Sequence, residues 1–484
     1  MDSFQDEGSL FAVAGHSQAA RLAYLGLHGL AHRGQAAVGI ACSDGNGIRC
    51  LRAPGFHALE NSLDQLETLR GRIALGQLTG ARVGRRRGLS FPAVQADQPI
   101  VVRWHQGQMA VAMAGKLTNG FQLRTELQER GAVFGAASDV EVLTHLIAKS
   151  SRGTFINRLV EALWNVKGAF CLTVCTEELL VAVRDPMGFR PLILGNLGQA
   201  TVIASEDTVL RNFNCTDLRE VLPGEMVIVD ATGVRSVFPF LKRPQAMCVE
   251  DVLQLARNDA QVYGVDVYPT RVALGRSLAK EQPCAIGEVV VGLPGAGVPA
   301  ALGYSQVSRI PYHRGLERAT RGRISEGSAM GLIHMDAEFG IRENPSILRG
   351  KNVVVIAPIL VSGKTVRAVV RMIRGSGARA VHVRIAAPPV KYSSPYGVVS
   401  PTSEVLIFRR FPSLDSLSAW LGSDSLGFLG IDGMRNVLGS GQGQSIGWCE
   451  TLFTGELPIP QEEVDTQIEM FRGAPSPHEE EAAT

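Results

Sequence analysis

The sequence predicts an α/β protein whose two halves are built differently. In the first half, short runs of β type alternate with amphipathic helical stretches at 18–30 and 139–149. Many strands with a few helices indicate sheets sandwiched between helices. The β-type runs include SLFAVAGH (9–16), GQMAVAMAG (107–115) and GEMVIVD (224–230).

The second half has the pattern of a parallel sheet. Its strand-like runs alternate with helical patterns, and they read EVVVGL (288–293), VVVIAP (353–358) and VHVRIAAP (381–388). Ligands of such sheets bind at the carboxyl ends of the strands. Each run has Gly or Pro at that end, so we expect a binding site there.

Length and composition suit a folded protein of several domains. The 484 residues suggest two to three domains. They are 45% hydrophobic and 19% charged, which is enough to bury a sizeable core. The formal net charge of +2 favours neither nucleic acid nor an acidic partner.

The sequence also bears on location and redox chemistry. No apolar run approaches the ~20 residues of a membrane span, and the start MDSFQDEGSL lacks the apolar core of a secretory signal. We therefore expect a cytoplasmic protein that binds neither membranes nor nucleic acid. The eight cysteines are dispersed without a C-x-x-C pair, which predicts neither disulfides nor zinc.

The stretch VVVIAPILVSGKT (353–365) ends like an ATP-binding P-loop. The P-loop pattern G-x-x-x-x-G-K-[ST] needs a first glycine at position 358, which is Pro358. A helix that starts after a buried strand is still a general anion site. Its candidate phosphate-binding residues are Ser362, Gly363, Lys364 and Thr365. An ordinary glycine-containing turn remains the alternative.

Further stretches resemble one enzyme family along nearly the whole chain. LAYLGLHGLAHRGQAAVGI (22–40) resembles the opening of glutamine phosphoribosylpyrophosphate amidotransferase, also called amidophosphoribosyltransferase. The other matching stretches keep the order of that family. They are SDVEVLTHLI (138–147), AVRDPMGFRPLILG (182–195), LPGEMVIV (222–229), VYPTR (267–271), PAALGY (299–304), IPYHRGL (310–316), VHVRIAAPPV (381–390) and FTGELP (453–458).

The resemblance implies two domains and an extension. Residues 8–240 would form an N-terminal-nucleophile (Ntn) hydrolase domain, an αββα sandwich that releases ammonia from glutamine. Residues 241–460 would form a type I phosphoribosyltransferase-like parallel sheet, which uses the ammonia to displace pyrophosphate from phosphoribosyl pyrophosphate at the start of purine synthesis. Residues 461–484 would be an extension with a polar, acidic and disordered end.

The glutaminase chemistry of this family is not carried by the sequence. The family uses an N-terminal cysteine as nucleophile, with its own α-amine as base, and alignment on Phe11 puts Gly8 in its place. Ser9 would substitute only after a one-residue slip.

Two further groups of the family's glutamine site are replaced. Thr79 stands where an arginine grips the glutamine carboxylate, and Ala114 stands where an asparagine helps form the oxyanion hole. Gly115 and Asp139 persist as remnants of the glutamine site. Asp139 equally reads as a charge at a helix N-terminus, which we prefer.

The phosphoribosyltransferase site shows a similar loss. Ala357 and Pro358 stand where relatives have the acidic pair that contacts the ribose hydroxyls, and the pyrophosphate-side loop 293–297 lacks its aspartate. The lid segment 318–324 is one residue short. Magnesium prefers carboxylate and phosphate oxygens, so metal and ribose lose their main ligands. Lys364 adds a charge where relatives offer a threonine, which favours a phosphate.

Some relatives carry an iron–sulfur cluster on four cysteines. Cys248 and Cys449 match two ligand positions, but Ser394 and Leu452 occupy the other two. Two thiolates of four do not hold a cubane in the usual way, so we expect no cofactor.

The sequence therefore predicts a pseudoenzyme of this family that acts by binding. Its expected ligand is a nucleotide monophosphate or phosphate at Ser362, Gly363, Lys364 and Thr365, and its expected partners are further copies of itself, an authentic amidophosphoribosyltransferase or another purine enzyme. The alternatives are an enzyme that acts on a different phosphorylated substrate and an ordinary amidophosphoribosyltransferase.

Overall fold

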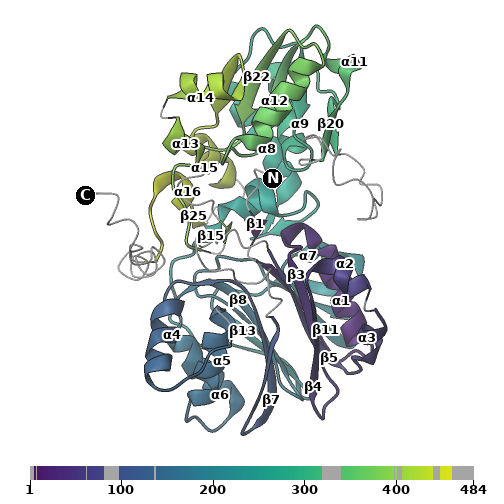
Figure 1. Ribbon diagram of the computed structural model, residues 1–484, viewed down its shortest axis with the longest axis vertical. Coiled ribbons are helices and arrows are strands. Elements are labelled where there is room, and N and C mark those ends of the chain that lie inside the picture. The colour runs from purple at the N-terminus through teal and green to yellow at the C-terminus, as the bar shows by residue number, and fades with distance from the viewer. Residues whose placement is uncertain are drawn as a thin grey trace, which may run out of the picture.

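The computed structural model describes residues 5–6, 8–61, 63–80, 98–135, 138–318, 340–396, 398–399, 406–411, 413–439 and 447–459 (Figure 1). The predicted lid segment 318–324, apart from Arg318, and the predicted extension 461–484 lie outside these residues. Within the described part of the chain, no helix has the length and apolarity needed to cross a bilayer.

Two antiparallel sheets face each other in the first half, which is the lower body in Figure 1. Among the described residues, one sheet has the strand order β12 (Thr216–Glu220), β10 (Ile193–Leu197), β11 (Ala200–Ala204), β2 (Gly8–Ala14), β5 (Ile73–Thr79), β3 (Ala37–Ser43), β4 (Ile48–Ala53). The other has the order β14 (Gly233–Val237), β13 (Met226–Asp230), β9 (Leu180–Arg184), β8 (Gly168–Cys175), β7 (Gly107–Leu117), β6 (Ile100–Trp104).

Helices cover the outer faces of both sheets, as predicted. On β2, Leu10 and Ala12 face the core between the sheets, whereas Phe11 and Val13 pack with Leu27 of a covering helix. A strand that is buried on both faces is apolar throughout, which explains the run SLFAVA. The helices are α1 (Ala19–Gly29), α2 (Gly55–Glu60), α3 (Leu63–Thr68) and α7 (Asp207–Asn212) on one side, and α4 (Gly120–Glu129), α5 (Asp139–Lys149) and α6 (Phe155–Asn165) on the other.

The second half contains the predicted parallel sheet. Its strand order is β18 (Val289–Gly292), β21 (Asn352–Ala357), β22 (Ala380–Ile385), β24 (Ser425–Phe428), and every neighbouring pair is parallel. The flanking helices are α8 (Val267–Glu281), α9 (Gly297–Ser308), α12 (Lys364–Gly375), α14 (Leu414–Leu421) and α15 (Ile431–Gly439). Strand β24 was not expected, because it is short and contains Gly427.

Short elements complete the described chain. Strand β1 pairs antiparallel with β23, so the N-terminal strand contacts the second half, and β15 pairs in parallel with β25 within that half. The short elements are β1 (Gln5–Asp6), η1 (Ala31–Arg33), β15 (Met247–Cys248), η2 (Asp251–Leu255), β16 (Gln261–Val262), β17 (Val265–Asp266), β19 (Leu316–Arg318), β20 (Ile341–Glu343), α11 (Pro345–Leu348), β23 (Val398–Val399), α13 (Ile407–Arg410), β25 (Trp448–Cys449) and α16 (Thr451–Thr454).

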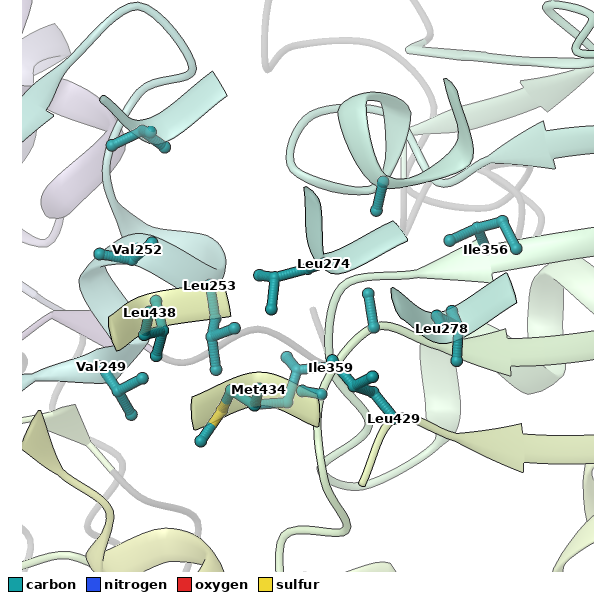
Figure 2. Close-up of a cluster of buried hydrophobic side chains, with 14 of the residues drawn as sticks. Val249, Val252, Leu253, Leu274, Leu278, Ile356, Ile359, Leu429, Met434 and Leu438 are labelled. Carbon is teal, nitrogen blue, oxygen red and sulfur yellow. The ribbon is translucent and has the colours of Figure 1, made fainter. Parts of the chain in front are cut away.

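In the core of the second half, the parallel sheet and α8 share an apolar cluster with η2, the segment that follows the first half along the chain. Figure 2 shows Val252 and Leu253 of η2, Leu274 of α8, and Ile356 at the end of β21 in one apolar cluster. Ile359, in the loop that follows β21, is buried in the same cluster. The loop before α12 is therefore held by apolar packing at its start.

A buried arginine connects the two halves. Arg33 of η1 lies between two carboxylates, with its Nε 3.0 Å from Glu206 Oε2 and its Nη1 2.8 Å from Asp251 Oδ1. Glu206 belongs to the first half and Asp251 begins η2. The hydroxyl of Tyr263 lies 2.7 Å from Asp251 Oδ2, and all these side chains are buried. Removal of one partner from such a group leaves an uncompensated buried charge.

The carboxyl groups in this network are held in their charged form. Burial alone would raise the pKa of Glu206, but Arg33 and His32 outweigh burial and lower it to about 2. A folded-state pKa below the ordinary value of 4.5 stabilises the fold above that value. This contribution is lost as the pH falls from about 4.5 toward 2.

We expect Arg33→Ala to lower the free energy of unfolding at pH 7 by about 3–5 kcal/mol, because it leaves Glu206 and Asp251 buried without their cation. Guanidinium chloride unfolding measures the loss. Arg257→Ala is the matched control, because Arg257 pairs with Asp259 at the surface and should cost under about 1 kcal/mol. Equal losses for the two variants would contradict this account.

Candidate functional site

The position predicted for the nucleophile has no room for a side chain. Gly8 begins β2 and pairs with Thr79 of β5. Its φ is +150°, and a Cβ built there would lie 2.2 Å from Leu78 O and 2.7 Å from Gln77 Nε2. Real Cβ atoms do not approach backbone oxygen so closely. Position 8 therefore carries no nucleophile, and this backbone would not accept one.

Ser9 does not replace the missing group. Side chains alternate along a strand, so Ser9 shares the helix-covered face with Phe11 and Val13 and points away from the face of Gly8. It is fully buried, and its Oγ has no hydrogen-bond partner among the described residues.

Neutral polar groups fill the place of the expected glutamine-binding arginine. Thr79 Oγ1 donates to Gln77 Oε1 at 2.9 Å, and both side chains are buried. Within the described residues, Gln77 Nε2 has no acceptor. The sequence singled out Thr79 but not Gln77, although the two residues stand two positions apart on the same β-type run.

Gly115 lies on β7, and Asp139 opens the helix that is fastened to the same strand. Gly115 has φ +112°, and a Cβ there would lie 2.1 Å from Ala169 O. Asp139 opens α5 after the N-cap Ser138, and its Oδ2 accepts a hydrogen bond from Leu117 N at 3.0 Å. This bond fastens α5 to β7, which favours a structural role for Asp139.

The candidate phosphate loop lies at the start of α12. Gly363 is the N-cap of this helix with φ +74°, and Lys364 is its exposed first residue. A Cβ on Gly363 would lie 2.8 Å from Trp420 Cζ3, so the glycine is needed for close packing against α14. Ser362 and Thr365 are partly buried beside it. The structure brings the four predicted residues to the positive end of a helix dipole.

The ribose end of the predicted site is apolar and small. Ala357 is fully buried at the end of β21. The gap beside it has no room for a water molecule. Its lining residues are Leu253, Arg271, Leu274, Ala296, Ala300, Pro358 and Ala386, and none of them is a carboxylate.

Arg271 is the one charged group on that lining, and it is already engaged. Its guanidinium donates to Val252 O at 2.8 Å, to Ala256 O at 2.9 Å and to Asn258 Oδ1 at 2.6 Å. Burial lowers the pKa of Arg271 to about 10. Arg271 was not singled out as a site residue, and these contacts show that it ties α8 to η2.

The two cluster-type cysteines lie opposite each other but do not form a metal site. Cys248 and Cys449 are register partners across the β15–β25 pair. Cys248 Sγ donates to Glu250 Oε2 at 3.0 Å, and burial raises the pKa of Glu250 to about 7. Leu452, at a third ligand position, is buried in the apolar cluster. Among the described residues, no group of three or more His, Cys, Asp or Glu could hold a metal. These residues do not fit a four-thiolate cluster.

The fold and the two sites define a class of protein: an Ntn-hydrolase glutamine amidotransferase sandwich joined to a phosphoribosyltransferase-type sheet. The family described as "Glutamine amidotransferase domain" matches residues 87–212. Amidophosphoribosyltransferase 1, chloroplastic, of Arabidopsis thaliana is 36% identical over 463 residues, which are 95% of this chain and 80% of the relative. The Bacillus subtilis amidophosphoribosyltransferase is 32% identical over 480 residues, which are 99% and 97% of the two chains.

Two solved structures also match the fold of this chain. The B. subtilis glutamine phosphoribosylpyrophosphate amidotransferase, complexed with ADP and GMP, matches with a TM-score of 0.84 at 32% identity, covering 93% of this chain and 97% of that one. A structure described as the allosteric regulatory enzyme of purine biosynthesis matches with a TM-score of 0.85 at 32% identity, covering 93% and 96%. The chain belongs to the amidophosphoribosyltransferase family.

We expect Gly8→Ala to destabilise the protein by more than about 3 kcal/mol, because the new Cβ meets Leu78 O and the φ is unfavourable for an L-residue. Gly45→Ala is the matched control, since Gly45 also has a positive φ, +89°, but nothing lies within 4 Å of its Cβ. It should cost about 1–2 kcal/mol, the strain alone. Denaturant unfolding measures both, and a Gly8→Ala variant as stable as Gly45→Ala would disprove the packing argument.

Proposed function

We propose that this chain is an amidophosphoribosyltransferase-like pseudoenzyme, which acts by binding rather than by catalysis in purine metabolism. The observation that carries the proposal is Gly8. A glutaminase of this type needs a nucleophilic side chain at that position, and here Leu78 O and Gln77 Nε2 occupy the space that the side chain would need.

The other altered positions support the same proposal. Ala114 offers a methyl group in place of an amide, and removal of one oxyanion-hole donor typically lowers the rate by about 100- to 1,000-fold. In the second domain, Ala357 and Pro358 offer no side-chain oxygen for magnesium or ribose hydroxyls. Both half-reactions of the family thus lack groups that would perform them.

Amidophosphoribosyltransferase activity, residual or on a different phosphorylated substrate, is the second candidate. The relatives favour it, because each is named for that activity and matches nearly the whole chain. Family membership is evidence for a shared reaction only as far as the reacting groups are shared. An activity assay therefore distinguishes the pseudoenzyme from the active enzyme.

We expect the purified chain to make no phosphoribosylamine from phosphoribosyl pyrophosphate, with either glutamine or ammonia as nitrogen donor. Metal analysis of the same preparation should find no four-iron cluster, because Cys248 and Cys449 are the only two thiols at the four ligand positions. The B. subtilis relative is the positive control for the assay. Product formation above the uncatalysed rate would overturn the pseudoenzyme proposal.

The proposed ligand is a nucleotide monophosphate or inorganic phosphate at Ser362, Gly363, Lys364 and Thr365. The solved relative was bound to ADP and GMP, which makes purine nucleotides the first ligands to test. Proposed partners are further copies of the chain, an authentic amidophosphoribosyltransferase and other purine enzymes. A cytoplasmic location stays a prediction of the sequence, and the curated relatives include chloroplastic proteins.

We expect AMP, GMP or phosphate to raise the melting temperature by a few degrees, since a ligand at 100 times its Kd stabilises by about 2.7 kcal/mol. Lys364→Ala should abolish the shift, whereas Lys280→Ala, an exposed lysine of α8, should keep it. Differential scanning fluorimetry measures both variants. Absence of a shift with all three ligands would rule out the phosphate site and leave the activity proposal standing.

A further inference from the structure

The exposed side of α12 and the neighbouring α13 form a basic surface, which we call the α12 basic face: Lys364, Arg367, Arg371 and Arg410. Helical spacing of three and four residues places the first three on one side of α12. Lys364, Arg371 and Arg410 are exposed and Arg367 is partly exposed. The opposite side of α12, with Val366, Val369, Val370 and Ile373, is buried against the sheet.

The indole ring of Trp420 lies beside two arginines of this surface. Arg367 lies over the ring of Trp420, 4.3 Å from its centroid, and Arg410 lies 6.0 Å from the same ring. Cations are attracted to the face of an aromatic ring within about 6 Å. Trp420 thus gathers two guanidinium groups from different elements into one place.

The cations of the α12 basic face have no counter-charge within the described residues. None of the four forms an ion pair there. Burial and the neighbouring Arg371 and Arg410 lower the pKa of Arg367, so the groups repel one another. Arg374, one turn further along the same helix, shows the contrast: it pairs with Asp424 at 2.7 Å. A cluster of like charges without a counter-ion is complementary to an anionic partner.

The chain itself contains a segment of matching charge. Residues 461–484 hold seven carboxylates and one arginine, a net charge of −6 with His478 neutral. The whole chain carries +2, so the first 460 residues carry +8. The carboxylates are Glu462, Glu463, Asp465, Glu469, Glu479, Glu480 and Glu481.

The segment has ample length to reach the α12 basic face. The last described residue before it is Ile459, whose backbone N lies 3.2 Å from the Tyr396 hydroxyl. Figure 1 shows α13, α14 and α16 along one side of the second domain. Twenty-five residues, 460–484, reach at most about 90 Å when extended, whereas a domain of this size has a radius of gyration of about 17 Å.

We propose that the α12 basic face is a docking surface for the acidic segment 461–484 of the same chain. Covalent linkage gives the segment an effective concentration in the millimolar range, so weak surface ion pairs suffice to hold it. The contact depends on charge and is screened by salt. Lys364 is shared with the proposed phosphate site, but Arg367, Arg371 and Arg410 are not, so the contact is tested separately from phosphate binding through these three arginines.

The test uses a fluorescent peptide of sequence 461–484 and full-length protein, read by fluorescence anisotropy at low salt. In one variant the seven carboxylates of the segment are changed to the corresponding amides. We expect this variant to bind the peptide at least about 10-fold more tightly than the native chain, whose own segment occupies the surface. Added salt, at about 0.3 M, should weaken binding.

Charge reversal locates the contact. Arg367→Glu, Arg371→Glu and Arg410→Glu, added to the neutralised variant, should reduce peptide affinity by at least about 10-fold. Arg276→Glu with Lys280→Glu, two exposed cations of α8, is the matched control and should change little. In the native chain, carbodiimide cross-linking should join Lys364 to a carboxylate of 461–484, which mass spectrometry of peptides identifies.

Three results would overturn the proposal. The first is no peptide binding to the neutralised variant at low salt. The second is binding that charge reversal leaves intact, which would place the segment elsewhere. The third is equal binding of an oligonucleotide to the native and neutralised chains, lost on charge reversal, which would assign the face to nucleic acid.

Discussion

The fold depends on one buried ion-pair group at the junction of its two domains. Arg33 joins Glu206, which follows β11, to Asp251, which begins η2. Strand β11 is paired with β2, where Gly8 lies, and η2 packs with Ile356 and Ile359 beside the loop before α12. The two candidate sites are therefore held in a common frame by this charge group. Loss of one member would leave charge in a medium that cannot solvate it.

The need to satisfy buried charge gives two of the sequence motifs a structural role. The HRGQ motif (32–35) supplies His32 and Arg33, and AVRDPMGFRP (182–191) supplies Arg184 and Asp185. Arg184 donates to Val221 O at 2.6 Å, and Asp185 accepts from Met187 N at 2.9 Å. Buried charged groups must be satisfied if the chain is to fold. These motifs therefore hold the scaffold.

Both candidate sites are closely packed around small residues. At position 8, backbone oxygen and an amide occupy the space of a side chain. At the end of β21, alanine and proline side chains pack beside an arginine that is committed to backbone carbonyls and an asparagine. Positive charge gathers on and around α12, where Trp420 packs against Gly363 and stacks with Arg367. This part of the second domain is thus suited to attract anions.

The sequence by itself determined the fold class and the residue types at the candidate sites. The β-type run SLFAVA and the alternation of strand and helix in the second half are local properties, so they were readable without a structure. The identities of Gly8, Thr79, Ala357 and Pro358 were likewise plain. Only the tertiary structure decided that Gly8 could not be other than glycine, because its obstacle, Leu78 O, is brought there by strand pairing across about 70 residues. The same reason hid the roles of Gln77, Arg271 and Trp420, whose contacts join elements far apart in the chain.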